Sequence, residues 1–151
     1  MNYTQYHKHC SYSNVITPDS VVFPEDYAKR AVELGQKVLS GVQHGWQGRA
    51  IEYYELAKKY NLKFLFGTEA YWVKDRLEKD RTNAHIILLA KNENGRKGIN
   101  RILSEASISG FYYRPRIDME LLLSLSPNSV WITTACIAGL WKYDNADELI
   151  L

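Results

Sequence analysis

Two imidazoles stand two residues apart in the stretch Tyr6-His7-Lys8-His9-Cys10-Ser11-Tyr12-Ser13, near the start of the chain. Residues i and i+2 of a strand point to the same face, so the rings of His7 and His9 are expected to share one space. Neutral imidazole is the commonest metal ligand, and two such rings suit Zn²⁺, Mn²⁺ or Fe²⁺. Two unrelated surface or core histidines would give the same pattern, so the pair is a weak signal by itself.

Further candidate ligands stand at the ends of predicted strands. His44 ends the apolar run 38–44, Glu69 ends the run 64–69, and His85 opens the run 85–90. The chain has four histidines, and all of them belong to this set. Active sites of α/β proteins gather where strands end, so this placement favours a shared metal site over scattered surface histidines.

Composition describes an ordinary globular chain. It has 151 residues, of which 46% are hydrophobic and 24% charged, enough for one domain with a core. No apolar run approaches the roughly 20 residues that a membrane helix needs, and the first residues lack a signal-peptide pattern. We therefore expect a cytoplasmic protein without a membrane partner. The formal net charge of +2 does not by itself indicate a nucleic-acid partner.

The chain reads as alternating strands and helices. Alternation of this kind predicts a single α/β domain with parallel strands and right-handed crossovers. The predicted strands are 3–9, 37–42, 62–69, 85–90 and 130–134. The predicted helices begin at Pro24 and end at Gly35, cover 46–60, follow Gly95, cover 118–125 and begin again near 144. Their inward stripes are Tyr27, Ala31 and Leu34; Ala50, Tyr54 and Ala57; and Ile99, Ile102, Leu103 and Ala106.

At this point the motifs resemble a known family. The order His7-x-His9, Gln43-His44-Gly45, Gly67-Thr68-Glu69-Ala70-Tyr71 and 85–92 is similar to the PHP (polymerase and histidinol phosphatase) domain. More narrowly, it resembles the N-terminal PHP domain of bacterial DNA polymerase III alpha subunits. The segments 110–118 and 134–139 are similar to later landmarks of that subfamily.

The resemblance implies a fold and a metal site. The fold would be an α/β, PHP-type distorted barrel, TIM-like, with metals at the C-terminal strand ends. The divalent metals (Zn, Mn or Fe) would be held by His7, His9, His44, Glu69, His85 and Cys136. Cys10 has no such support and is expected to pack in the core, because two cysteines are too few for a disulfide framework.

Two departures from the family pattern bear on activity. Gln43 stands where the family usually has an aspartate, which removes a negative charge from a cation site. Nothing after Cys136 matches the family's last Asp-x-His ligand pair. We therefore expect residues 1–151 to be the N-terminal part of a PHP domain, a truncated barrel with partial metal occupancy and low activity.

Several functions follow from the resemblance. The first is a metal-dependent phosphoesterase module of a polymerase III alpha-like protein in DNA replication, with 3′–5′ exonuclease proofreading as one form of it. The second is a degenerate, non-catalytic scaffold of the replicative polymerase. The third is a stand-alone phosphatase of the histidinol-phosphate type, which the polymerase-like segment 110–118 disfavours. The family implies a DNA-directed DNA polymerase subunit, but the polymerase catalytic residues are absent from this sequence.

The expected partners follow from the same reading. The remainder of a polymerase III alpha-like chain, or a separate completing chain, would cover unpaired sheet edges, and so would a second copy in a homo-oligomer. DNA would be an indirect partner. The segment Phe111-Tyr112-Tyr113-Arg114-Pro115-Arg116 is aromatic and basic, which suits stacked bases and phosphates. The same segment is also typical of a loop whose arginines pair with acids such as Asp118 or Glu120.

Overall fold

A computed structural model describes residues 3–15 and 18–143, which form two compact units. The first unit ends at Thr68, and the second begins at Glu69. Strand β2 (Lys63–Trp72) runs through this boundary and contributes residues to both units. No helix within the described ranges has the length and hydrophobicity to cross a membrane. The helix predicted from residue 144 onward lies outside these ranges.

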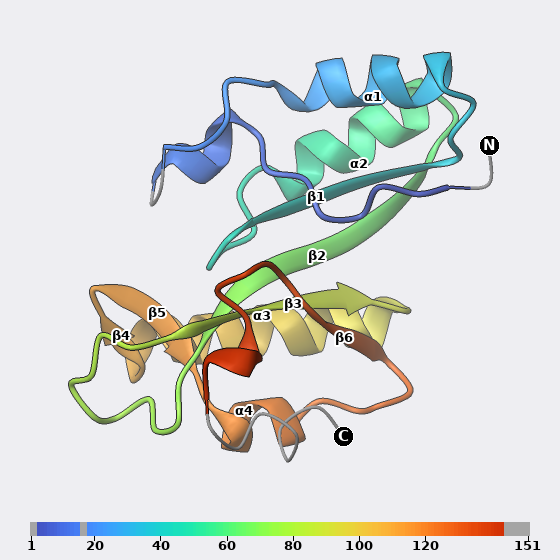
Figure 1. Cartoon of the computed structure of the whole chain (residues 1–151). Helices are drawn as coiled ribbons and strands as arrows, with labels where there is room; N and C mark the ends of the chain where they lie inside the picture. The colour runs from blue at the N-terminus through green and yellow to red at the C-terminus, as the bar shows by residue number, and fades with distance from the viewer. Residues whose placement is uncertain (1–2, 16–17, 144–151) are drawn as a thin grey trace. The chain divides into compact units, whose positions relative to one another are not determined.

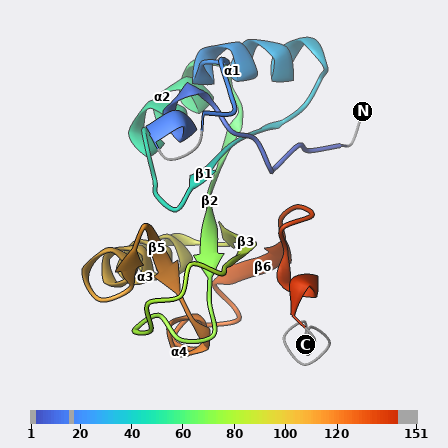
Figure 2. The same ribbon diagram turned by 60° about the vertical axis from the view of Figure 1, so that its left-hand side comes forward.

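Two helices and a strand build the first unit. Helices α1 (Pro24–Glu33) and α2 (Ala50–Lys59) lie together on one face of β1 (Val38–His44), as Figures 1 and 2 show. β1 pairs with β2, and a short 3-10 helix, η1 (Ser11–Val15), follows the N-terminal segment. One buried hydrophobic cluster of this unit contains Cys10, Ala28, Leu39, Tyr53 and Ala57. The prediction that Cys10 packs in the core is therefore confirmed.

The start and the end of α1 follow the sequence signals. Pro24 occupies the first turn, where its missing N–H costs nothing, and Glu25 and Asp26 place negative charge at the helix N-terminus. The Asp26 carboxylate accepts a hydrogen bond from the backbone N–H of Phe23 at 3.2 Å. Gly35 adopts a φ of +67° just beyond the helix, which a residue without Cβ does without strain.

Gly41 on β1 allows the ring of Tyr53 to lie directly on the strand. A Cβ at position 41 would stand 2.5 Å from the Cε2 atom of Tyr53. Carbon atoms in contact are normally separated by about 3.5–4.0 Å, so any side chain at 41 would displace the ring.

A mixed sheet forms the second unit. Its strands follow the order β4-β5-β2-β3-β6, with α3 (Glu93–Ile108) packed against β3 and β5. The remaining elements are β3 (Ala84–Ala90), β4 (Phe111–Tyr112), β5 (Arg114–Ile117), α4 (Met119–Leu123), β6 (Val130–Thr134) and η2 (Leu140–Lys142). The predicted α3 stripe of Ile99, Ile102, Leu103 and Ala106 is buried, as expected.

Strand direction differs from the prediction. β2 and β5 are parallel, with Tyr71 opposite Arg116, but β3 and β6 are antiparallel, with Leu88 opposite Ile132. β4 and β5 form an antiparallel hairpin that the sequence analysis did not anticipate. The α/β class is confirmed, whereas the all-parallel arrangement is wrong. An apolar run of five to seven residues predicts a buried strand equally well in either direction.

Local predictions in the first unit also need correction. Residues 3–9 form no strand. Leu34 and Tyr54 are 43% and 49% exposed, although both were expected to face inward. Tyr53 is the buried tyrosine of α2, because the helix turns the face of Tyr53 and Ala57 toward β1.

A buried guanidinium ties the irregular parts of the second unit together. Arg116 on β5 is 2% exposed. Its guanidinium donates four hydrogen bonds to backbone carbonyls. These acceptors lie at 2.6–2.9 Å and belong to Gly110, Arg76, Glu78 and Asp80. The loop 73–83 and the end of α3 are therefore held by one side chain.

We predict that Arg116→Met destabilises the protein by about 2–4 kcal/mol, because the carbonyls that it binds lose charge-assisted donors. The matched control is Arg101→Met on α3, whose exposed guanidinium binds Ser124. That control should cost less than about 1 kcal/mol. Urea unfolding followed by circular dichroism measures both changes. Equal destabilisation by the two substitutions would contradict the assigned role of Arg116.

Candidate metal centre

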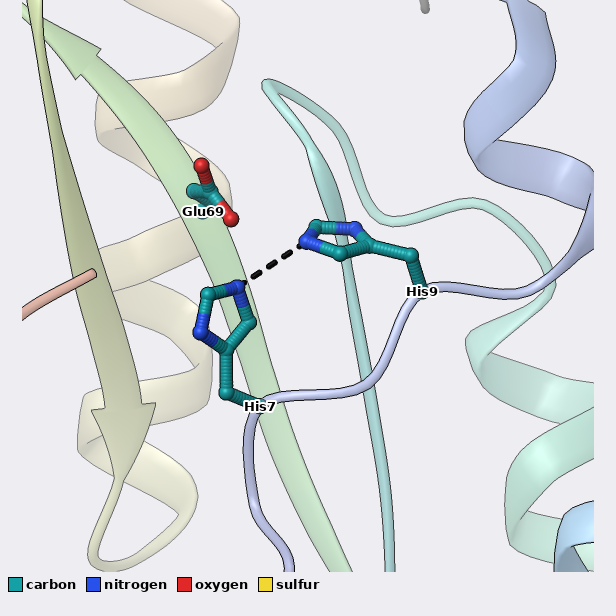
Figure 3. Close-up of side chains that lie close together, drawn as sticks. All are labelled: His7, His9 and Glu69. Atoms are coloured by element: carbon teal, nitrogen blue, oxygen red, sulfur yellow. Dashed lines mark hydrogen bonds between the residues drawn. The ribbon is translucent and has the colours of Figure 1, made fainter. Parts of the chain in front are cut away.

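The N-terminal segment is held beside β1 by two hydrogen bonds. The backbone N–H of Val42 donates to the Lys8 carbonyl at 3.1 Å, and the Ser40 hydroxyl donates to the Tyr6 carbonyl at 2.6 Å. His7 and His9 project from this segment, and their Nε2 atoms lie 2.9 Å apart (Figure 3). Two nitrogens bound tetrahedrally to one zinc at about 2.1 Å would lie roughly 3.4 Å apart. The prediction that both rings share one space is confirmed.

His44 joins this pair at the end of β1. Its ring stacks on that of His9, with centroids 4.0 Å apart and an angle of 13° between the planes. Its Nε2 lies 2.6 Å from Oδ2 of Asp19. One ligand atom from each of His9, Asp19 and His44 lies within 4.8 Å of the others, which is compact enough for one ion.

Asp19 is the candidate ligand that the sequence analysis missed. It stands in a loop beside Pro18, where an acidic residue is usually read as part of a turn. The only available signal was its position shortly after the His-x-His pair. A carboxylate beside two imidazoles changes the donor set, because it adds a negative charge and an oxygen ligand.

A hollow of about 400 Å³ opens beside this cluster, lined in part by His7, Lys8, His9 and Asp19. Lys8 is 8% exposed, and burial lowers the pKa of its ammonium group to about 8. Its Nζ lies 5.2 Å from the centroid of the Tyr27 ring. The residues that line the hollow therefore include imidazole, carboxylate and amine side chains.

The second unit holds the other three predicted ligands. Glu69 on β2 is 1% exposed, and its Oε1 lies 2.5 Å from Nδ1 of His85 on β3. The Cys136 Sγ lies 3.6 Å from the same nitrogen and accepts a hydrogen bond from the Ala138 N–H at 3.4 Å. The Tyr71 ring meets the His85 ring edge to face, with centroids 5.1 Å apart. Glu69, His85 and Cys136 thus converge, as their sequence positions indicated.

Three of the six predicted ligands belong to each unit. His7, His9 and His44 gather with Asp19 in the first unit, and Glu69, His85 and Cys136 gather in the second. That all of them share one centre stays a prediction.

The aromatic and basic segment is divided between structural and exposed roles. Arg116 points inward, as described above, and Asp118 and Glu120 bind Arg76, each at 2.7 Å, instead of the arginines expected for them. Tyr113 is 60% exposed with a φ of +60°, and the Arg81 guanidinium lies 3.7 Å from its ring centroid. The segment is therefore less basic on its surface than its composition suggests.

Comparisons with known proteins agree on one family. The model of the PHP domain matches residues 5–145. DNA polymerase III subunit alpha of Borreliella burgdorferi is 35% identical over 140 residues, which cover 89% of this chain and 12% of that protein. The corresponding subunit of Aquifex aeolicus is 31% identical and covered to 13%, with 94% of this chain matched. That of Helicobacter pylori is 33% identical, with 93% of this chain and 12% of the relative covered.

Solved structures give weaker similarity. One is a Bifidobacterium adolescentis protein described as a metal-dependent phosphoesterase, with a TM-score of 0.45 and 21% identity over 64% of this chain and 32% of that one. Another is an amidohydrolase of Chromobacterium violaceum with bound sulfate, with a TM-score of 0.42 and 21% identity over 66% and 34% of the two chains.

The relatives are much longer than this chain, which spans only 12–13% of their length. The matches nevertheless cover 89–94% of this chain. Because the family model matches residues 5–145, the chain belongs to the PHP domain family.

Proposed function

We propose that this chain is the metal-binding, phosphoesterase-type PHP module of a DNA polymerase III alpha-like protein. The observation that carries the proposal is the group His9, Asp19 and His44, whose ligand atoms lie within 4.8 Å of one another. Imidazole nitrogens with a carboxylate oxygen suit Zn²⁺, Mn²⁺ or Fe²⁺ better than Mg²⁺ or Ca²⁺, which prefer oxygen ligands.

Each unit by itself contains proposed metal ligands. Within the first unit they are His7, His9, Asp19 and His44, and within the second unit they are Glu69, His85 and Cys136. A bound divalent metal would lower the pKa of a coordinated water and polarise a phosphoryl oxygen. The buried ammonium of Lys8, in the wall of the hollow beside His7 and His9, would attract the anionic phosphodiester.

The proposed substrate is a phosphodiester of single-stranded DNA, cleaved from the 3′ end. The relatives named as DNA polymerase III alpha subunits support this choice. A non-catalytic scaffold is the second candidate. It is favoured by the neutral Gln43, which stands where the family usually has an acid. The side-chain oxygen of Gln43 accepts from Ser13 and Cys10, so position 43 supports the N-terminal segment in either case.

We predict that protein purified without added metal contains substoichiometric Zn, Mn or Fe, and that Asp19→Asn weakens binding on the order of 10- to 100-fold. The asparagine keeps the size of the side chain but loses its charge. Elemental analysis and isothermal titration with Zn²⁺ and Mn²⁺ measure the two effects. Glu33→Gln, at an exposed carboxylate beside Arg30, is the control and should leave affinity unchanged. Unchanged affinity in Asp19→Asn would exclude Asp19 as a ligand.

We predict slow, Mn²⁺- or Zn²⁺-dependent shortening of a 5′-labelled single-stranded oligonucleotide, abolished by Glu69→Gln. The substitution removes the buried carboxylate next to His85 and therefore one of the proposed metal ligands. Glu78→Gln in the exposed loop should retain the wild-type rate. Metal binding without any turnover that depends on Glu69 would favour the scaffold, and robust hydrolysis that survives Glu69→Gln would overturn the assignment.

The outer edge of β6 is the proposed partner site. β6 ends the strand order of the sheet and has neither a charged residue nor a proline, and Trp131 and Ile132 are 51% and 49% exposed. Natural sheets usually protect such an edge with lysine, proline or a covering segment. We propose that a further strand covers it, from the longer polymerase-like chain or from a second copy.

We predict that the isolated chain associates through this edge and that Ile132→Lys makes it monomeric. A lysine on the edge strand disfavours pairing with a second strand. Light scattering over a dilution series measures the mass. Ile51→Lys on α2, where the side chain is 80% exposed, is the matched control and should leave association unchanged. A wild-type protein that is monomeric at every concentration would refute the second-copy form of the proposal.

A further inference from the structure

The side-chain amide of Gln43 is buried, and its orientation is fixed by its partners. Gln43 on β1 is 1% exposed. The backbone N–H of Cys10, 3.4 Å away, can only donate, so the atom facing it is the amide oxygen Oε1. On the other side, the amide nitrogen donates to the hydroxyl of Tyr53 at 3.4 Å.

The orientation of Gln43 in turn fixes the hydroxyl proton of Ser13. The Ser13 Oγ lies 2.6 Å from the Gln43 Oε1, and Ser13 is fully buried. Two oxygens at this distance need a proton between them, and Oε1 has none to give. The Ser13 hydroxyl therefore donates its proton to Gln43. The lone pairs of the Ser13 Oγ can then accept hydrogen bonds from other neighbours.

His9 is the neighbour that meets those lone pairs. Its Nδ1 lies 3.0 Å from the Ser13 Oγ. Since the only hydroxyl proton of Ser13 points at Gln43, the hydrogen bond needs a proton on Nδ1 of His9. A neutral imidazole has one N–H, so the proton at Nδ1 leaves a lone pair on Nε2.

The lone pair on Nε2 points toward the candidate ligands of the first unit. This nitrogen lies 2.9 Å from Nε2 of His7 (Figure 3), and the His9 ring stacks on that of His44. We propose that Gln43 and Ser13 are positioning residues, which hold His9 in the Nδ1–H tautomer so that Nε2 can bind the metal. The part of this inference that concerns metal binding rests on the function proposed above.

The chain of hydrogen bonds from Gln43 through Ser13 to His9 requires a hydrogen-bond acceptor at position 43 but no charge there. An amide oxygen accepts the hydrogen bonds from Ser13 and Cys10 as a carboxylate oxygen would, without adding a negative charge beside the cluster. Tyr53 completes the arrangement, and burial raises the pKa of its phenol, which keeps the hydroxyl protonated. Gly41 makes the arrangement possible, because any Cβ there would displace the Tyr53 ring.

The test is ¹⁵N NMR of the histidine rings in metal-free protein, in alkaline buffer. Single substitutions of the four histidines assign the His9 signals. The wild-type protein should show Nδ1 protonated and Nε2 unprotonated. Ser13→Ala and Gln43→Met, the latter of similar size but without an amide, should give a mixture of tautomers. Gln43→Glu keeps an acceptor for Ser13 and should retain the wild-type pattern.

Ser11→Ala is the matched serine control. The Ser11 Oγ is buried and has no hydrogen-bond partner among the residues that the structure describes, so its removal should leave His9 unchanged. Circular dichroism confirms that each variant is folded, and Ser13→Ala decides alone if Gln43→Met is not. A wild-type His9 protonated at Nε2, or a tautomer that survives the loss of Ser13, would overturn the inference.

A second measurement separates this inference from the proposed function. Zn²⁺ affinity should fall about 10-fold in Ser13→Ala and Gln43→Met and stay unchanged in Ser11→Ala. Gln43→Glu, which keeps the acceptor and adds a negative charge near the cluster, should not weaken it. If NMR shows the expected His9 tautomer while the wild-type protein binds no metal, the roles of Gln43 and Ser13 in setting the tautomer are supported and the proposed metal function is wrong. If metal binds equally well in all variants, the positioning role is wrong while the metal function stands.

Discussion

A full positive charge buried on β5 is the constraint that organises the second unit. Removing a guanidinium from water is costly unless its donors are satisfied. Arg116 meets this requirement with backbone carbonyls, which hold the loop 73–83 and the end of α3. Within that loop, Arg76 binds Asp118, whose carboxylate also caps α4 by accepting from Leu121. One desolvated charge thus links a loop, a hairpin and two helices beside the strand that contains Glu69.

In the first unit, buried neutral side chains rather than a buried charge connect the structural elements. The amide of Gln43, the hydroxyl of Ser13 and the phenol of Tyr53 form a buried chain of hydrogen bonds. Such chains give conformational specificity only when fully satisfied, because a buried polar group without a partner is costly. This chain of hydrogen bonds leads to the imidazole of His9. The packing of the core therefore also determines the protonation of a candidate metal ligand.

Sequence patterns predicted the positions of most strands, because buried apolar runs such as those of β2 and β3 are read directly from residue type. They also predicted that Glu69 and His85 lie close together, since both were placed at strand ends. Asp19 escaped prediction because a loop, which has no periodicity, brings it to His44. The inward arginine at 116 escaped because charge is ordinarily read as surface. Strand direction escaped because it depends on pairing between distant segments.

The close contact between Gly41 and Tyr53 limits how this sequence can drift. A side chain at 41 would have to occupy space that the tyrosine ring already fills. Neither position can therefore change freely while the other stays as it is. A smaller residue at 53 would leave space for a side chain at 41. It would also remove the hydroxyl that accepts a hydrogen bond from the amide N–H of Gln43. Residues 41 and 53 are therefore expected to change together or to stay the same. Selection should remove variants with a larger residue at 41 alone because they fold poorly, whatever their effect on catalysis.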